Sequence, residues 1–495
     1  MKISDYFSLN VTQYELDFVD VDLDKDCPLY IDPFLISISN SPWSIQADRT
    51  LKSFFNEFKS AMITKNYDKA RELFIYMSEP KDNCFGISTK GTSNGKGVGA
   101  LNTEKIVHKI IESNAIECGL VNNIEDIIIF VEDIDKDKLS DMCTNILRYK
   151  LIEYTKSQCA LWNIKTQKAN TLPFWDAEGT RWVYTEDEQL FIDNRSVLLV
   201  PKSIVSPIKI FQMSKYNWHF VIENERNYQL THGSSLVRQR VLKNGKVKYY
   251  LPKIDVAEDI NKKINHGEFL STKHFIREYT LKNPNLFVDF VDQSKRCIKC
   301  LSNGEIVEFS DDGLDVDIII DNLIVRLKRI KSGKESASEF HRLIKIIIEI
   351  LFYPYLTNPI IEREIHEGRK RVDIVMDNNA QDGFFFNLHS IAKIYCPYVY
   401  IECKNYGKDV SNPEIDQLSS RFSPQRGQFG ILICRDLENE ELFKKRCIDT
   451  YKDQRGFVIY FTDNDIISML NFVKSEVYDR IWGLLEEKKR DIVVS

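Results

Sequence analysis

The sequence lacks a long hydrophobic run, an excess of basic residues and any repeated or proline-rich segment. Although 43% of its 495 residues are hydrophobic, no apolar run approaches the roughly 18 residues that span a bilayer. Residues 1–18 include acids where a signal peptide needs an uninterrupted apolar core, so we expect a cytoplasmic protein without a membrane partner. The net charge of -6 excludes a general coat of positive charge, and any nucleic-acid surface must be local.

The cysteines also show no regular spacing along the sequence. The eleven cysteines are scattered through a long chain, and several lie inside apolar segments, as reduced core residues do. Cys297 and Cys300 form a CxxC pair, but no second pair follows at zinc-finger spacing. The pattern therefore favours two cysteines on a strand or turn over a zinc site.

Three domains are expected from the length, at roughly 150 residues per domain. Residues 1–168 form a predicted α/β domain for sensing or target recognition, with strands expected at 18–23 and 126–132. Residues 169–326 alternate short apolar runs, including 218–223, with polar turns, which indicates a mixed middle domain or connector. Residues 327–495 form the third domain.

The third domain has the clearest pattern. Residues 339–353 carry apolar side chains at helical spacing, and Pro354 marks the end of that helix. Five strand-like runs follow, with helical stretches between the later ones, which predicts an α/β fold with an open mixed sheet flanked by helices. The five runs are 359–365, 371–376, 398–404, 429–434 and 457–461.

Two of these strands carry charged residues at positions that suggest chemistry. The alternation of side chains along a strand puts Glu402 and Lys404 on one face. Asp373 lies within the preceding apolar strand, where an unpaired charge is costly. A Mg²⁺ ion held by Asp373, Glu402 and the Cys403 carbonyl would compensate it, with Glu339 reaching the metal directly or through water. Lys404 would then orient or deprotonate a metal-bound water.

This arrangement resembles the PD-(D/E)xK nuclease superfamily, which has the restriction-endonuclease-like fold, over residues 336–461. Val372 stands where proline often precedes the aspartate, and the segment 377–397 between the motif strands is long. In the Mrr-like branch the next helix often supplies a glutamine, and Gln417 looks like its counterpart. The resemblance implies an endonuclease that hydrolyses DNA with Mg²⁺, or Mn²⁺ as a substitute, in restriction or anti-phage defence. It implies catalytic roles for Asp373, Glu402, Lys404 and Gln417, with metal bound by Glu339, Asp373 and Glu402.

Other interpretations stay open. Lys404 and one carboxylate could form a buried salt bridge while the other acid is solvated, although such a pair leaves a third inward acid unexplained. The domain could also be an inactive nucleic-acid-binding or assembly module, or cleave RNA. Cleavage of both DNA strands needs two sites, which suggests a homodimer or larger homo-oligomer, and a protein activator or partner is a further possibility.

Basic residues are expected to contact DNA at two places. In residues 237–253, Asn244-Gly245 predicts a hairpin with a two-residue turn. Lys243, Lys246 and Lys248 then share one face, and Arg238 and Arg240 point to the other. Such a ribbon binds in a DNA groove, or is a soluble hairpin protected by lysines. The second place is the start of the Asp373 strand, with Arg369, Lys370 and Arg371.

Two features of the first domain have open interpretations. The glycine-rich residues 86–106 do not fit a phosphate-binding P-loop, and a mobile loop before a helix is preferred to an anion site. The polar residues of the helix at 140–148 share one helical face, which either faces water or forms a recognition surface.

Overall fold

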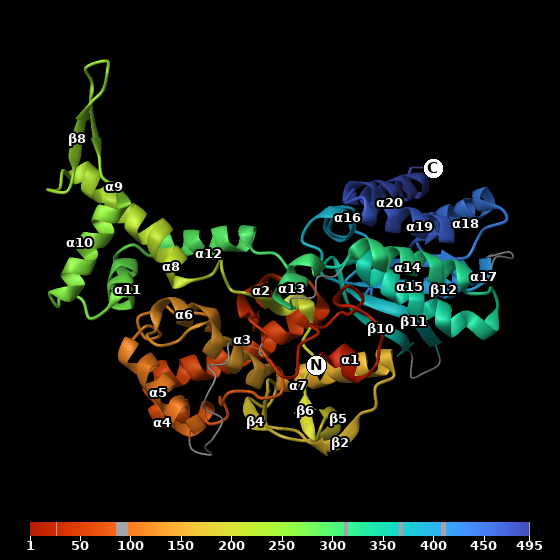
Figure 1. Cartoon of the computed structure of the whole chain (residues 1–495), viewed down its shortest axis with the longest axis horizontal. Helices are drawn as coiled ribbons and strands as arrows, with labels where there is room; N and C mark the ends of the chain where they lie inside the picture. The colour runs from red at the N-terminus through yellow and green to blue at the C-terminus, as the bar shows by residue number, and fades with distance from the viewer. Residues whose placement is uncertain (26, 86–97, 311–314, 366–369, 407–411, 495) are drawn as a thin grey trace.

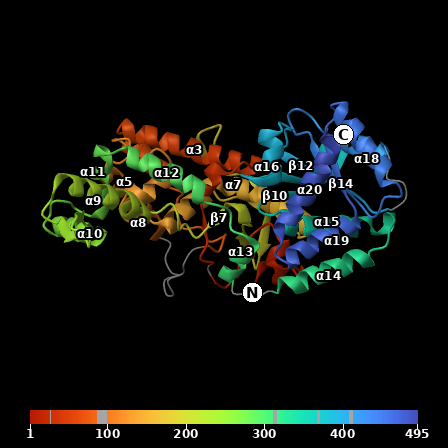
Figure 2. The same ribbon diagram turned by 90° about the horizontal axis from the view of Figure 1, so that it is seen from above.

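The structure is a computed structural model that describes residues 1–25, 27–85, 98–310, 315–365, 370–406 and 412–494. Its buried apolar side chains form two clusters, one drawn from residues 3–306 with Tyr353, and one from residues 320–492. The molecule is elongated, with the second cluster at one end and a helical arm with a hairpin at the other (Figure 1 and Figure 2). No helix in the described ranges is long and apolar enough to cross a membrane.

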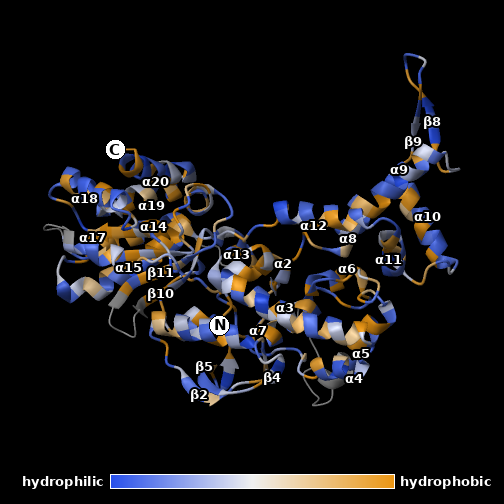
Figure 3. Ribbon diagram, turned by 180° about the vertical axis from the view of Figure 1, so that it is seen from behind, coloured by the Kyte–Doolittle hydropathy of each residue, from blue (hydrophilic) through white to orange (hydrophobic). Residues whose placement is uncertain are grey.

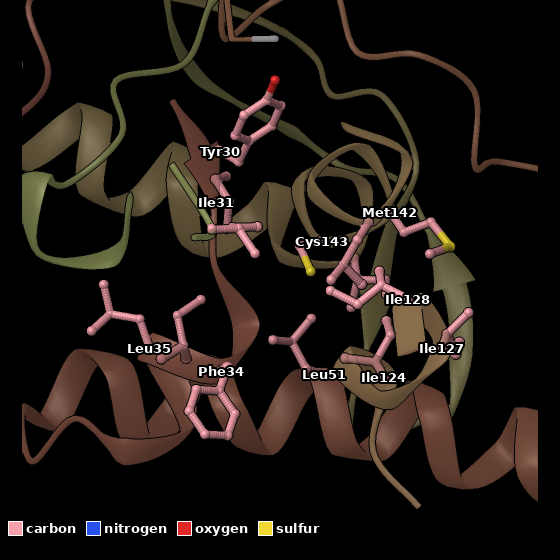
Figure 4. Packing of buried hydrophobic residues seen from close by; sticks show 14 of the residues in the cluster. Tyr30, Ile31, Phe34, Leu35, Leu51, Ile124, Ile127, Ile128, Met142 and Cys143 are labelled. Carbon is pink, nitrogen blue, oxygen red and sulfur yellow. The ribbon is translucent and has the colours of Figure 1, made fainter. Parts of the chain in front are cut away.

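Two long helices organise the first cluster. Helix α3 (Pro42–Ile63) begins where the Ser41 hydroxyl accepts a hydrogen bond from the Ser44 N–H at 3.0 Å, which satisfies a free donor of the first turn. Helix α7 (Lys136–Trp162) is capped in the same way by Asp135 and ends at Asn163, whose φ is 55°. Leu51 of α3 packs near Ile124 and the α7 side chain of Cys143 (Figure 4).

Short helices and small sheets complete the N-terminal part, which is mixed α/β as expected. Its β1–β7, β2–β5–β6 and β3–β4 sheets are small and lie mostly after α7. The helices are α1 (Ile3–Tyr6), α2 (Pro33–Ile38), α4 (Tyr67–Leu73), α5 (Val98–Ser113) and α6 (Ile127–Phe130). The strands are β1 (Tyr30–Ile31), β2 (Gln167–Asn170), β3 (Phe174–Asp176), β4 (Arg181–Val183), β5 (Glu186–Ile192), β6 (Arg195–Val197) and β7 (Val205–Ser206).

Two predicted strands are wrong, and one apolar run of the middle domain is helical. Residues 126–132 contain α6, whose four residues are all buried, and a short run that is apolar on every side does not distinguish a strand from a buried helix. Residues 218–223 lie in a π-helix (Asn217–Val221) and the start of α9 (Ile222–His232). Residues 18–23 make only isolated bridges, from Phe18 to Pro201 and from Asp22 to Lys2.

The arm is formed by the middle of the chain. Its helices lead to a hairpin that projects from the body, away from the C-terminal sheet (Figure 1 and Figure 3). The helices of the arm are α8 (Met213–Tyr216), α9, α10 (Lys253–Asn265), α11 (Thr272–Lys282) and α12 (Asn285–Cys297), and the hairpin strands are β8 (Arg238–Val241) and β9 (Val247–Tyr250). Helix α13 (Asn303–Ser310) follows the arm and lies in the body (Figure 1).

The C-terminal part confirms the predicted mixed sheet of five strands. The order is β10-β11-β12-β13-β14, antiparallel in the first two pairs and parallel in the last two. Every residue of β13 is buried, as expected for a strand covered on both faces. The strands are β10 (Leu356–Ile365), β11 (Lys370–Asn378), β12 (Tyr398–Lys404), β13 (Phe429–Cys434) and β14 (Phe457–Phe461).

Helices flank this sheet. The long segment between β11 and β12 forms α16 (Gly383–Phe386) and a π-helix (Asn387–Ile391). It packs at the opposite end of the strands from Lys404, because Phe384 contacts Phe429 at the start of β13 with ring centroids 6.2 Å apart. The other helices are α14 (Val316–Arg329), α15 (Ala337–Phe352), α17 (Asn412–Ser419), α18 (Glu440–Lys452), α19 (Asp463–Lys474) and α20 (Tyr478–Val493).

Candidate active site

Asp373 lies where strands β11 and β12 part. The recorded pairing of the two strands ends at Ile374 and Ile401. One residue beyond, the Asp373 carboxylate accepts a hydrogen bond from the Cys403 N–H at 2.8 Å. The side chain therefore continues the strand pairing in place of a backbone carbonyl, which fixes a carboxylate between the two strand ends.

Glu402 and Lys404 lie on the same face of β12, as their alternation predicts. The Lys404 ammonium donates to Glu402 Oε1 at 2.8 Å and to Gln417 Oε1, on α17, at 2.9 Å. The structure thus brings together four of the predicted residues, Asp373, Glu402, Lys404 and Gln417. A lone Lys404–Glu402 ion pair would not account for Asp373, which has a separate hydrogen bond in the same place.

Burial dominates the electrostatics of Glu402. Its side chain is 1% exposed, and burial raises the pKa of this carboxyl; nearby Asp373 raises it further, whereas Lys404 and Arg421 oppose the shift. Arg421 Nη2 lies 3.5 Å from Glu402 Oε2. That oxygen is buried and has no hydrogen-bond partner in the described part of the chain, so it has a lone pair for a ligand.

The helix residue beside the site is His341 rather than Glu339. His341 Nε2 lies 3.9 Å from Asp373 Oδ2, whereas Glu339 is exposed. Residues two apart on a helix are about 200° apart around its axis, so the two side chains leave α15 in nearly opposite directions. The predicted metal role of Glu339 thus has no support in this geometry.

The donor set fits magnesium. No group of three or more His, Cys, Asp or Glu side chains is arranged for metal binding in the ranges that the structure describes. However, Mg²⁺ keeps several waters and takes only one or two carboxylates. Asp373, Glu402 and the Cys403 carbonyl could supply such a set, and Glu402 Oε2, which has an ionic contact with Arg421 but no hydrogen bond, could accept the metal.

A partly buried polar network holds the chain after β12. Asn405 donates to the carbonyls of Lys331 and Gly333 at 2.9 Å each, and it accepts from Arg435 at 3.3 Å. Arg435 in turn pairs with Asp463 at 2.8 Å. This network ties the end of the Lys404 strand to the turn before α15, so the elements that carry the site are joined behind it.

Three residues near the site were not predicted from the sequence: His341, Arg421 and Arg435. Arg421 follows Gln417 by four residues, a spacing that places two side chains on one side of a helix, and this spacing could have drawn attention to it. His341 is a polar residue between two buried apolar residues of α15, Phe340 and Leu343. Nothing in the local sequence marks Arg435, whose partners come from distant segments.

The hairpin has a different register from the predicted one. Arg240 pairs with Lys248 and Val241 with Val247, and the loop is closed by the Leu242 N–H bonded to the Lys246 carbonyl at 2.8 Å. The loop therefore has three residues, with Gly245 at φ 75°, rather than a two-residue turn. The shift by one residue changes which side chains share a face. One face carries Arg238, Arg240, Lys246, Lys248 and Tyr250, and Lys243 lies in the loop.

Arg238 forms an ion pair with Asp255, so the hairpin's cations are not equivalent. All residues of β8 and β9 are exposed. Of the other basic group, Arg369 lies outside the described residues, and the structure describes Lys370 and Arg371 only as part of β11. The glycine-rich loop at 86–97 also lies outside them.

The polar face of α7 points inward, so its interpretation as a solvated or recognition surface is wrong. Arg148 pairs with Asp82, and both side chains are buried. The Asn83 amide donates to the Thr144 hydroxyl at 2.9 Å, and Asn145 donates to the Ser78 carbonyl at 2.7 Å. These residues bind the segment 78–83 to the helix and serve the packing of the N-terminal part.

Comparison with known proteins adds one finding. Residues 8–212 match a family described as Domain of unknown function (DUF8370). This similarity covers less than half of the chain and stops well before the candidate site. No curated protein and no solved structure matches the chain.

Proposed function

We propose that the protein is a metal-dependent endonuclease that hydrolyses phosphodiester bonds of DNA through Asp373, Glu402 and Lys404. The observation that carries the proposal is the convergence of two carboxylates and an ammonium at the ends of β11 and β12, with Gln417 bonded to the ammonium. The resemblance of this part of the chain to PD-(D/E)xK nucleases supports a restriction-endonuclease-like fold and the same chemistry.

Each residue has a role that follows from its position. Asp373 and Glu402 would hold Mg²⁺ or Mn²⁺, which when bound acts as a Lewis acid and lowers the pKa of water. Lys404, fixed by Glu402 and Gln417, orients the attacking water and offsets the charge that develops on the phosphate. The attacking water gives up a proton to solvent and its oxygen bonds to phosphorus while the bridging P–O bond breaks, and the leaving oxygen takes a proton from solvent. Arg421 adds a second positive charge beside Glu402.

The biological setting is a further part of the proposal. A large N-terminal part joined to such a catalytic domain suits a cytoplasmic restriction or anti-phage protein, in which the N-terminal part senses or selects the target. The described residues of each chain carry a single candidate site, so cutting both strands of a duplex would require a homodimer, a larger homo-oligomer or two encounters.

The test is a competition assay. Supercoiled plasmid, single-stranded DNA and RNA are mixed with the purified chain in Mg²⁺, Mn²⁺ or EDTA, and the same mixture is given to Asp373→Asn. We expect DNA to be cut in either metal, with no cutting in EDTA or by the variant. Preferential cutting of RNA would change the proposed substrate from DNA to RNA and leave the proposed mechanism unchanged.

A second candidate is an inactive module that binds nucleic acid. It is favoured by the ionic contacts of Glu402 with Lys404 and Arg421, which could satisfy the carboxylate without metal. In that case the wild-type chain would bind DNA, fail to bind Mn²⁺ in calorimetry and leave every substrate intact.

A further inference from the structure

A groove lies beside the candidate active site, between the N-terminal and C-terminal parts of the chain. Its volume is about 320 Å³. Helix α7, which contacts β10, provides one wall near its C-terminal end, and α15 and β10 provide the other. The groove is lined by Leu161 of α7 and Asn163 just after it, by His341 and Arg342 from α15, and by Ile360 and Ile361 from β10.

The groove is continuous with the candidate site through one residue. His341 lines the groove, and its Nε2 lies 3.9 Å from Asp373 Oδ2. Ser338, His341 and Arg342 are spaced by three and four residues on α15 and therefore share a face. A ligand in the groove would therefore contact His341, the residue that borders Asp373.

The chemistry of the lining suits one nucleotide. Ile360 and Ile361, which are partly exposed, offer apolar surface for a base. The Asn163 amide offers a donor and an acceptor for the edge of the base, and the Ser157 hydroxyl, which already donates to the Tyr154 carbonyl, offers an acceptor. Arg342 is exposed and can contact a backbone phosphate. The volume is at the lower end of the roughly 300–1,000 Å³ of small-molecule sites, so it holds a single nucleotide and excludes a duplex.

We propose that this groove binds one unstacked nucleotide of the substrate strand, next to the phosphate that is cut. The inference rests on the proposed nuclease function and specifies its substrate as DNA with an unpaired or displaced nucleotide. It also gives the N-terminal part a direct contact with the substrate, because Leu161 and Asn163 belong to the segment that matches the DUF8370 family.

A substitution that fills the groove tests this proposal. Ala160 lines it and is exposed, so Ala160→Trp blocks the groove without replacing a core residue. Ser60→Trp, at an exposed position of α3 outside the groove, is the matched control. Both are made in a Lys404→Ala chain, and binding in Mg²⁺ is measured for a duplex with one unpaired 2-aminopurine and for the fully paired duplex.

We expect the parent and Ser60→Trp chains to bind the unpaired duplex about tenfold more tightly than the paired one, equivalent to about 1.4 kcal/mol, with a change in 2-aminopurine fluorescence. Ala160→Trp should lose both the preference and the fluorescence change. Equal behaviour of Ala160→Trp and Ser60→Trp, or no preference in the parent, would overturn the inference. Because binding is measured without cleavage, failure of the nuclease proposal would appear separately, as an inactive wild type.

Discussion

At the residue scale, the proposed chemistry depends most on the Lys404 ammonium. Hydrogen bonds to Glu402 and Gln417, at 2.8 and 2.9 Å, fix it from two elements. We expect Lys404→Ala to lower the cleavage rate at saturating DNA by about 10²–10⁴-fold, because the group acts on the reacting atoms. Initial rates on labelled DNA measure this effect, and thermal melting verifies that the variant is folded.

Lys445→Ala is the control for this substitution, since Lys445 is exposed on α18. Its rate should stay within about twofold of the wild-type rate, as expected for a surface position. A folded Lys404→Ala chain that cuts as fast as Lys445→Ala would remove Lys404 from the mechanism.

Asp141 gives a prediction about pH and stability. Burial raises the pKa of its carboxyl to about 8, and the nearby acids Asp137 and Glu79 add to the shift. In the unfolded chain the group ionises near 3.8, so between these pH values the folded state alone keeps the proton. The contribution of protonated Asp141 to the stability of the folded state is complete below about pH 4 and is lost as the pH rises through 8.

Asp141→Asn should therefore raise Tm at pH 8 by about 3–6 °C and change it little at pH 4. Asp68→Asn, at a position where the side chain is 98% exposed, should change Tm little at either pH. Melting curves from pH 4 to 8 test this, and an equal shift of both variants at pH 8 would show that Asp141 ionises normally.

At the scale of elements, the β8–β9 hairpin presents a basic face to solvent. Arg240 and Lys248 are directly opposite each other on that face. Replacing both with glutamine should weaken DNA binding by about tenfold and reduce the slope of log K against log salt by about 1.8, as two lost phosphate contacts do. Fluorescence anisotropy over a salt series measures both quantities.

The opposite face of the same hairpin provides the control. Gln239 and Tyr249 form a cross-strand pair there, and replacing both with glutamate changes the net charge by the same two units. A salt slope reduced equally by the two double variants would mean that overall charge matters and the basic face does not.

The elements that could be predicted from the sequence are those with a strong local pattern. The five strands of the C-terminal sheet are apolar runs, and alternation alone places Glu402 and Lys404 together. The register of the hairpin could not be predicted in this way, since Asn244-Gly245 is compatible with both a two-residue turn and the observed loop with Gly245 at φ 75°. The strand predicted at residues 126–132 is wrong because a run that is buried on all sides shows no periodic pattern of apolar and polar residues.

Contacts between segments that are distant in the sequence account for the other differences between prediction and structure. Arg148 on α7 is neutralised by Asp82, 66 residues earlier, so the burial of that polar face depends on a partner that helical spacing does not reveal. The same holds for His341, which reaches Asp373 only because α15 packs against β11. Residue types and their periodic spacing identify candidate functional groups, and tertiary packing decides which of these groups lie in contact.

At the scale of the whole molecule, a buried ionic cluster joins the two apolar cores. Lys202 Nζ lies 3.3 Å from Glu349 Oε1, and both side chains are fully buried. Lys345 is the second basic residue of the cluster, and the charges of Glu349, Asp17 and Glu15 act on it. Lys345 and Glu349 follow His341 on α15 by one and two turns, so this cluster also fixes the helix beside the candidate site.

Glu349→Leu should destabilise the folded chain by about 3–5 kcal/mol, because it leaves a buried ammonium without its partner. The double variant Lys202→Met/Glu349→Leu removes one charge of each sign and should recover most of that loss. Urea unfolding followed by circular dichroism compares the two. A double variant no more stable than the single one would show that the pair contributes through packing and not through charge.

Asp373, Glu402 and Lys404 are proposed to form a metal-dependent phosphodiesterase site. The most direct test is the initial rate of DNA cleavage by the wild-type chain as a function of Mg²⁺ concentration, from EDTA to millimolar metal. We predict no cleavage in EDTA, a saturable rise with Mg²⁺, and no rise for Asp373→Asn. Cleavage that is independent of metal, or an equal rise for Asp373→Asn, would contradict the account.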